Sequence, residues 1–184
     1  GAKDRGPGIN PILEVVENCK KPIVCAIHGT AFGGGLETAM ACHYRVTAPS
    51  ALVGQPECKL GIIPGAGGTQ RLPRLAGVAV AAEMCAFGNP VPAKNALSAG
   101  IVDKIIEGDL LSGAVAFARE LAAAGKPPRR TRDLTEKLSD KAANEQSLAA
   151  VRGEIKKRSR GLLAPARAVD AVEAATKLPF DEGL

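Results

Sequence analysis

The sequence predicts an α/β fold, because short apolar segments alternate with helical ones over most of the chain. Residues 23–27 are apolar and rich in β-branched side chains, and three glycines then lead into helix-forming residues 36–41. A basic, proline-interrupted stretch at 126–130 precedes a charged and then alanine-rich region. We therefore expect a core over residues 1–125 and a helical C-terminal region over residues 126–184.

Length and composition favour one globular domain and exclude several classes of function. The chain has 184 residues, of which 46% are hydrophobic, and this is enough for one sizeable core. With one Tyr, four Phe and no Trp, it lacks aromatic side chains for stacking bases, so we do not expect nucleic-acid binding. No apolar run approaches the roughly 20 residues of a membrane span, and no signal-peptide core is present. We expect a protein that is not secreted, and whose net charge of +5 helps to hold a polyphosphate.

The five cysteines are predicted to be free, buried thiols. They are scattered, odd in number and without a CxxC pair, so neither disulfides nor a metal site is expected. They stand at positions 19, 25, 42, 58 and 85.

The remaining elements are predicted from apolar periodicity and from glycine and proline positions. A helix at 10–19 should have Pro11 in its first turn and Ile12, Val15 and Val16 on one face. Strands are expected at 44–47, 51–53 and 101–106. Helices are expected from the 65–68 turn to Gly77 and over 78–87, 93–99, 110–124 and 164–177.

The chemistry-bearing residues cluster around the glycine turn at 33–35. Without Cβ atoms, this turn lets a ligand lie against the main chain, where the first N–H groups of the helix stabilise negative charge. Glu37 lies in the first helical turn, and Glu57 follows twenty residues later. Gln55 and Pro56 should keep the backbone extended, which would present Glu57 at the end of a strand. Two carboxylates beside such a turn suit acid–base chemistry next to a carbonyl.

Each of these features also has a purely structural interpretation. The glycines could serve close packing of strand and helix, Glu37 could favour the helix dipole, and Glu57 could be a surface carboxylate. A nucleotide loop at 65–68 is disfavoured, because the lysine of that motif is absent. His28 and His43 are expected to be structural, and the arginines at 129, 130 and 132 to form a solvated face or to contact phosphate.

Taken together, the motifs resemble those of the crotonase superfamily, the enoyl-CoA hydratases and isomerases. The resemblance is carried by Lys21-Pro-Ile-Val, Gly33-Gly-Gly-Leu-Glu37, Gly54-Gln-Pro-Glu57 and Ile63-Pro-Gly-Ala-Gly-Gly-Thr-Gln-Arg-Leu72, in this order. Residues 97–104 are similar to a later helix-to-strand passage of the family. Residues 163–184 resemble the end of the hydratase part in multifunctional fatty-acid β-oxidation enzymes.

The resemblance implies a spiral of ββα units, an acyl-CoA thioester substrate, no cofactor and no metal. It implies that Glu37 activates a water, Glu57 protonates C2, and the Gly34 N–H stabilises the thioester oxygen. Further substrate-binding residues would be Gly33, Gly35, Gln55, Pro56, Pro64 and Gly65. The family's upstream loop, which resembles F-x-x-G-A-D and supplies a second N–H, has no counterpart here, so the chain is expected to be truncated at its N-terminus relative to the family.

Several alternatives stay open at this point. Hydration of 2-enoyl-CoA is favoured because both glutamates are present, but a Δ3,Δ2-isomerase or a bifunctional enzyme is compatible. A non-catalytic acyl-CoA-binding or assembly fragment is the non-enzymatic alternative. The resemblance implies a homo-oligomer, a trimer or hexamer, or part of a multifunctional chain. The expected location is cytoplasmic for a bacterial protein and otherwise mitochondrial or peroxisomal.

Overall fold

The structure, a computed structural model, describes residues 8–159 and 161–184 and has a mixed α/β architecture. Within these residues the strands form two small sheets. The first has the order β1 (Val24–Ile27), β3 (Tyr44–Thr47), β6 (Lys104–Ile105), and all its strands are parallel. The second has the order β2 (Thr30–Phe32), β4 (Leu52–Gly54), β5 (Val91–Pro92), with β2 parallel and β5 antiparallel to β4. The α/β prediction is confirmed.

The helices between the strands follow the predicted punctuation closely. They are α2 (Gly34–Ala41), α3 (Gly68–Ala76), α4 (Val78–Phe87), α5 (Ala93–Ala99) and α6 (Leu110–Ala123). The predictions for α4 and α5 are confirmed at both ends. Gly77, Gly88 and Gly100 end α3, α4 and α5 as expected, each with a positive φ that disfavours other residues.

Three predictions for the strands and loops were wrong in detail. The 101–106 strand shortens to β6, because the N–H groups of Ile101 and Val102 donate to Ala96 and leave only two residues paired with β3. The short strand β2 was missed within the glycine-rich turn. Glu57 does not end a strand; it lies in the first turn of a 3-10 helix, η1 (Pro56–Leu60), which begins at Pro56 directly after Gln55.

The face of α1 (Ile9–Glu17) was also predicted wrongly. Ile12 and Val15 are exposed, whereas Leu13 and Glu17 are buried. Leu13 packs with Ala41 and Ala66, and Glu17 forms an ion pair with Arg71. Because Glu17 is buried by its ion pair, the buried face of α1 includes a charged residue, and a search for periodic apolar residues does not find it.

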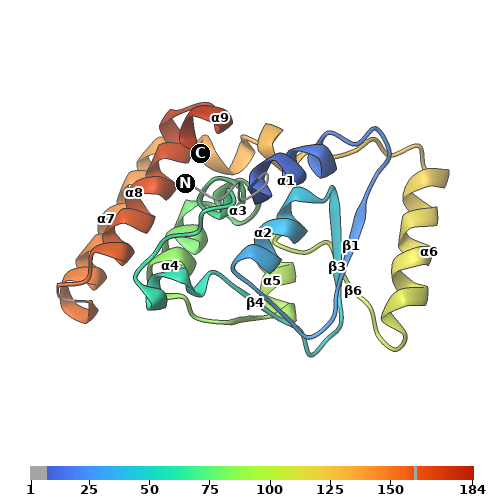
Figure 1. The fold of residues 1–184 in the computed structure, drawn as a ribbon, viewed down its shortest axis with the longest axis horizontal. Coiled ribbons are helices and arrows are strands. Elements are labelled where there is room, and N and C mark those ends of the chain that lie inside the picture. Colours follow the sequence, from blue (N-terminus) through green and yellow to red (C-terminus); the bar gives the residue numbers. More distant parts are fainter. Residues whose placement is uncertain (1–7, 160) are drawn as a thin grey trace, which may run out of the picture.

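The C-terminal part is helical, as predicted, and packs on α3 and α4. Two short 3-10 helices, η2 (Thr131–Asp133) and η3 (Glu136–Leu138), lead into α7 (Lys141–Arg158), α8 (Leu163–Lys177) and α9 (Phe180–Gly183). Figure 1 shows α7 and α8 running side by side along one end of the molecule, next to α4. Ala168, Val169 and Val172 of α8 join the same buried cluster as the core of α4.

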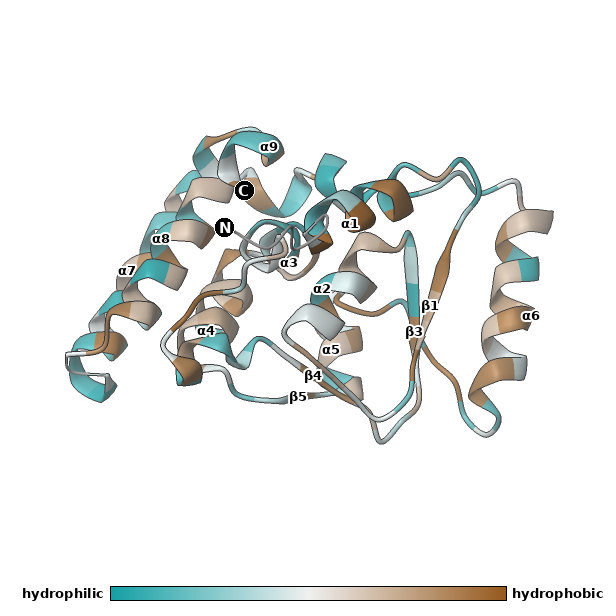
Figure 2. Ribbon diagram, viewed as in Figure 1, coloured by the Kyte–Doolittle hydropathy of each residue, from teal (hydrophilic) through white to brown (hydrophobic). Residues whose placement is uncertain are grey.

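The opposite end of the molecule has a smaller core of its own. There α6 covers the first sheet, and Figure 2 shows β1 as a strongly hydrophobic strand facing this region. Val46, Ile106 and Ala114 form its buried centre. The larger cluster of buried apolar side chains, the main cluster, lies between α2, α3, α4 and α8, beside the glycine turn.

The arginines at 129, 130 and 132 do not form one solvated face, since only Arg130 has an exposed ion pair, with Asp133, as the prediction expected. Arg129 donates to Asp103 at 2.5 Å and lies over the Tyr44 ring. Arg132 pairs with Asp181 and lies over the Phe180 ring. Arg129 and Arg132 thus hold the segment after α6 against the rest of the fold, because a guanidinium group can bind a carboxylate and an aromatic face together.

The structural role predicted for His43 is confirmed, whereas the burial predicted for the cysteines holds for three of the five. His43 is buried, and its ring contacts the Ile23 N–H at 2.9 Å and the Glu17 carbonyl at 3.0 Å, so its role is structural; His28 is exposed. All five cysteines are free, although Cys19 and Cys25 are only half-buried. Among the described residues, no helix has the length and hydrophobicity that a membrane crossing requires.

Candidate active site

A glycine turn positions the first group of the site, the N-terminus of α2. Gly33 precedes the helix with φ of 53° and ψ of −125°, a conformation open to glycine but strained for other residues. Its N–H donates to the Gly54 carbonyl at 3.0 Å, which ties the turn to β4. Gly34 and Gly35 are exposed, and the Gly34 N–H has no acceptor within residues 8–159 and 161–184. The turn therefore presents a free donor at the positive end of a helix.

Glu37, one turn into α2, is held in a buried site by main-chain donors. Its side chain is 3% exposed, and Oε1 accepts the N–H groups of Ala66 and Gly68, each at 2.8 Å. Burial raises the pKa of Glu37, while these two N–H groups and the charge of Arg71 oppose the rise. A carboxyl group with a raised pKa is suited to exchanging protons near neutral pH.

Glu57 approaches the same turn from η1. It is largely buried, and burial raises its pKa, with a further rise from the charge of Glu37. A Cβ on Gly33 would lie 2.8 Å from Glu57 Oε1, so the glycine is needed for this approach. With its amide nitrogen turned to Glu57, Gln55 donates to both carboxylate oxygens at 3.1 Å; the reverse orientation would set acceptors against each other.

Gly68 packs closely against Glu37 and against Gln55, the partner of Glu57. A Cβ there would lie 2.5 Å from the Gln55 amide, 2.9 Å from Glu37 Oε1 and 2.9 Å from Pro64. The Gln55 amide, which contacts Glu57, therefore lies close to the Glu37 carboxylate at Gly68. Two carboxyl groups with raised pKa values thus lie in each other's electrostatic field, beside an exposed helix N-terminus.

Most of the predicted site residues come together, and two lie at the margin. Glu37, Glu57, Gly33, Gly34, Gln55 and Pro64 converge on the glycine turn, with Gly35 next to it in α2. Pro56 begins η1, and a Cβ on Gly88 would lie 2.7 Å from its Cα. Gly65 is exposed, and its carbonyl accepts from Asn10 at 3.4 Å.

The amide donors of Ala66 and Gly68 were missed as functional residues. The only signal for them was the glycine-rich run 65–68, which was interpreted as the start of a helix. Arg71 was likewise not predicted to act on the site. It forms an ion pair with Glu17 at 2.7 Å and lowers the pKa of Glu37 through its charge.

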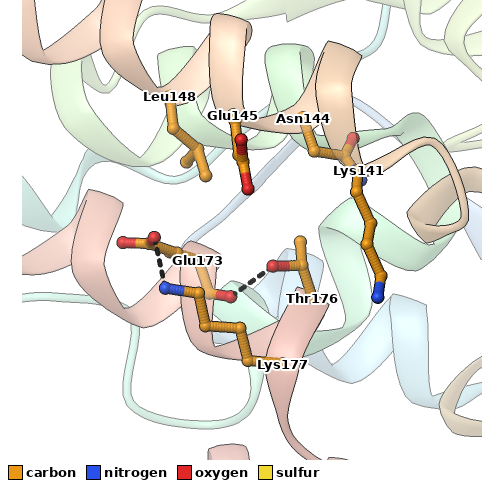
Figure 3. Close-up of a pocket in the computed structure, with 7 residues that line it drawn as sticks. All are labelled: Lys141, Asn144, Glu145, Leu148, Glu173, Thr176 and Lys177. Atoms are coloured by element: carbon orange, nitrogen blue, oxygen red, sulfur yellow. Dashed lines mark hydrogen bonds and ion pairs between the residues drawn. The ribbon is translucent and has the colours of Figure 1, made fainter.

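A separate pocket of about 380 Å³ lies between α7 and α8 and contains none of the predicted site residues. Figure 3 shows its charged side chains, among them Glu145, Glu173 and Lys177. Lys177 binds Glu173 at 2.6 Å, and Glu173 also accepts from Arg152, so much of this charge is paired within the two helices. Its paired carboxylate Glu173 has a lowered pKa, because Lys177 and Arg152 bind it, in contrast to the raised pKa values of Glu37 and Glu57.

Comparison with known proteins agrees with this geometry. The profile of the family described as Enoyl-CoA hydratase/isomerase matches residues 3–160. The chain is 44% identical over 182 residues to a peroxisomal bifunctional enzyme of Danio rerio, covering 98% of this chain and 25% of the relative. It is 41% identical over 170 residues to a glyoxysomal fatty acid β-oxidation multifunctional protein of Cucumis sativus, covering 92% and 23%. The chain thus spans about a quarter of the length of these relatives.

Solved structures of the same family share the fold. The crystal structure of an enoyl-CoA hydratase from Bacillus anthracis superposes with a TM-score of 0.60 at 31% identity, over 85% of this chain and 67% of that one. An enoyl-CoA hydratase subunit from Geobacillus kaustophilus gives a TM-score of 0.58 at 31% identity, over 93% and 53%. On the evidence of the profile, the relatives and the site, the chain belongs to the enoyl-CoA hydratase/isomerase family, the crotonase family that its motifs resemble.

Proposed function

We propose that this chain carries the hydratase site of an enzyme that adds water to 2-trans-enoyl-CoA to give 3-hydroxyacyl-CoA. The observation that supports the proposal most strongly is the pair Glu37 and Glu57. Both carboxyl groups are buried, both have raised pKa values, and both lie beside the open N-terminus of α2. Substrate-binding roles are proposed for Gly33, Gly35, Gln55, Pro56, Pro64 and Gly65.

The charges that the reaction creates match the groups of the site. When the oxygen of water bonds to C3 of the enoyl thioester, electron density moves to the thioester oxygen as an enolate. The Gly34 N–H is directed at that oxygen in our proposal, and one such donor contributes roughly 3–4 kcal/mol of transition-state stabilisation. Negative charge near the positive end of a helix dipole is favourable as well.

The protons are exchanged by the two carboxyl groups. Glu37 takes a proton from the attacking water, and its two main-chain donors hold its Oε1 in place. Glu57 gives a proton to C2 when the enolate collapses, and Gln55 orients its carboxyl group. The net change is one water added across the double bond. Glu37 has then gained one proton and Glu57 has lost one, so the transfer of one proton from Glu37 to Glu57 restores both. No metal or redox cofactor enters the proposed steps.

A bifunctional hydratase and Δ3,Δ2-isomerase is a second candidate. It is favoured by the family description, which names both activities, and by relatives named as bifunctional enzymes. Isomerisation moves a proton between C4 and C2 and requires no attacking water, so it can proceed with Glu57 alone.

The two candidates differ in their dependence on Glu37. Hydration and isomerisation should be measured on the complete protein for Glu37→Gln, with the exposed Glu145→Gln as control. We expect hydration to fall by about 10²–10⁴-fold, the usual contribution of a general base, while isomerisation persists. Equal loss of both activities would contradict the assignment of the water to Glu37. Acyl-CoA binding without any turnover would favour the non-catalytic alternative.

We further infer that the chain is the hydratase part of a longer multifunctional β-oxidation enzyme in peroxisomes. Relatives that match over nearly all of this chain are peroxisomal or glyoxysomal multifunctional proteins about four times as long. A homo-oligomer, trimeric or hexameric, is the competing assembly. Sedimentation of the natural protein separates them, since a monomer of multifunctional size supports the first and a trimer of short chains the second.

A further inference from the structure

A second pocket, with several charged residues in its lining, lies at the end of α3 that is remote from Gly68. It has a volume of about 320 Å³ and is formed by the last turn of α3, the loop after α5, and the segment that contains η3. Its charged lining residues are Arg74, Asp103, Arg129, Glu136 and Lys137. None of them belongs to the proposed hydratase site.

Arg74 is a buried cation without a carboxylate partner in this pocket. Its side chain is 5% exposed, Nη1 donates to the Gln70 carbonyl at 2.7 Å, and the guanidinium lies 5.2 Å from the Phe180 ring centre. Its Nε is buried and finds no acceptor among residues 8–159 and 161–184. Burial lowers the pKa of Arg74. The charge of Glu17 raises this pKa, and the charges of Arg132 and Arg71 lower it further. An unpaired buried donor on a cation is costly unless an anion binds it.

Two further cations face the same space. Arg129 uses Nη2 to bind Asp103 and the His43 carbonyl, but its buried Nε also lacks an acceptor within the described residues. Lys137 lies at the rim, where Nζ donates to the Ala99 carbonyl at 2.8 Å and a Cβ on Gly100 would lie 2.9 Å from it. The ammonium group has three donors, so it can bind a further acceptor.

Of the two carboxylates of the pocket, Asp103 is paired with Arg129, and Glu136 is paired with none of the three cations. Both oxygens of Asp103 are occupied, Oδ2 by the main-chain N–H of Arg45 at 2.7 Å and Oδ1 by Arg129 at 2.5 Å. Glu136 is exposed and forms no ion pair among the described residues. Among the described residues, Arg74 and Lys137 are therefore the cations of the pocket without a carboxylate partner, beside the solvated carboxylate of Glu136.

We propose that this pocket binds an oxyanion of the phosphate class, through Arg74, Arg129 and Lys137. Guanidinium groups bind phosphate oxygens through charge-assisted hydrogen bonds, and their planar fork of donors fits two oxygens of one phosphate group. The ligand is either free inorganic phosphate or a phosphoryl group on a larger molecule. This site goes beyond the proposed hydratase activity and does not depend on it.

Calorimetric titration of the complete protein with inorganic phosphate, at constant ionic strength, tests the site. We expect saturable binding that weakens at least tenfold in Arg74→Met and in Lys137→Met. The exposed Lys94→Met removes the same charge elsewhere and should bind phosphate as the wild type does. Absence of saturable binding, or equal binding by Arg74→Met, would overturn the proposal.

Thermal unfolding separates a ligand role of Arg74 from a merely structural one. Phosphate at ten times its Kd should raise the Tm of the wild type by about 3 °C and leave that of Arg74→Met unchanged. Arg74→Lys, which keeps the charge but loses Nε, should show an intermediate rise. A structural role predicts instead that Arg74→Met lowers the Tm equally with and without phosphate, with the same phosphate-induced shift as the wild type.

The affinities of CoA and 3′-dephospho-CoA, compared in the wild type and in Arg74→Met, identify the source of the phosphoryl group. Tighter binding of CoA that disappears in Arg74→Met identifies the 3′-phosphate as the occupant. Equal affinity of the two compounds, together with phosphate binding that Arg74→Met abolishes, identifies a free phosphate or another phosphorylated molecule.

Discussion

At the scale of single residues, the site depends on glycines that make room for two carboxyl groups. Gly33 admits Glu57, and Gly68 admits both Glu37 and Gln55; a Cβ at either glycine would lie only 2.5–2.9 Å from these side chains. Each position thus favours glycine for a steric reason, because a larger residue would crowd these side chains, whether or not a turn is formed there. The two carboxylates are brought near one another at a cost in stability, which is a common property of functional sites.

The Gly34 N–H can be removed with little disturbance of the fold. Gly34 is the first residue of α2, where proline is well tolerated, and a Cβ there meets no atom within 4 Å among the described residues. Gly34→Pro should lower kcat for hydration by about 10²–10³-fold, the cost of one oxyanion donor. Gly34→Ala keeps the N–H and serves as the matched control. Similar rates for the two variants would show that this N–H has no part in the reaction.

The raised pKa values make stability depend on pH in a defined direction. A carboxyl group with a folded-state pKa above its ordinary value of 4.5 binds more protons in the folded state, so its stabilising contribution is complete below 4.5 and is lost as the pH rises through the folded-state pKa. We expect the free energy of unfolding to fall over this window. In Glu57→Gln the fall should be smaller and the stability at pH 7 higher, as measured by urea unfolding. An unchanged slope relative to Glu145→Gln would contradict the burial of Glu57.

The identity of the site could be predicted from the sequence, but part of its geometry could not. Glu37, Glu57 and the glycine turn are local motifs, and their spacing carries the family resemblance. The donors of Ala66 and Gly68 are main-chain groups, so no side chain announces them. The ion pair of Arg71 with Glu17 joins residues 54 positions apart in the sequence, a distance that no local pattern encodes.

At the scale of elements, helix ends were predicted better than strands or helix faces. A glycine with a positive φ ends α4 and α5 where the sequence predicts it, because other residues are strained there. β6 depends instead on the extent of pairing with β3, which is a tertiary property. The buried face of α1 is decided by Glu17, which accepts from Arg71 and from the Arg132 N–H.

The Glu17–Arg71 pair connects α1, α3 and η2 and should be essential for their packing. The side chains are 0% and 4% exposed, and the Nη2–Oε2 distance is 2.7 Å. Glu17→Gln would leave the Arg71 charge buried without its partner, which typically costs about 3–5 kcal/mol of unfolding free energy. The exposed pair Glu154–Lys157 offers a control, and Glu154→Gln should leave the stability almost unchanged, because exposed ion pairs contribute little. A similar small loss for Glu17→Gln would mean that the pair contributes no more than a surface one.

At the scale of the whole molecule, the C-terminal helices complete the core on which the site rests. Figure 1 shows α8 lying along α4, and Ala168, Val169 and Val172 are fully buried within the main cluster. The sequence predicted α8 from its alanine content and from Pro165 near its start, within a C-terminal region expected to be helical. It did not predict the packing partners of α8, since the small residues of this helix carry no information about which helix they contact.

Small residues at this contact should be intolerant of added volume. Ala168→Leu should lower the free energy of unfolding by about 1–3 kcal/mol through overpacking, as monitored by circular dichroism. Ala150→Leu adds the same atoms on the exposed face of α7 and should leave stability within about 0.5 kcal/mol of the wild type. Equal stability of the two variants would contradict the close packing of α8 on α4.

The central claim is that Glu57 and Glu37 act together on water and thioester at the glycine turn. It is tested most directly by the hydration rate of Glu57→Gln in the complete protein with a 2-enoyl-CoA substrate, since glutamine keeps the shape of the side chain but cannot act as an acid or a base near neutral pH. The account predicts a loss of about 10²–10⁴-fold in kcat with substrate binding retained. A rate equal to that of the wild type would contradict it.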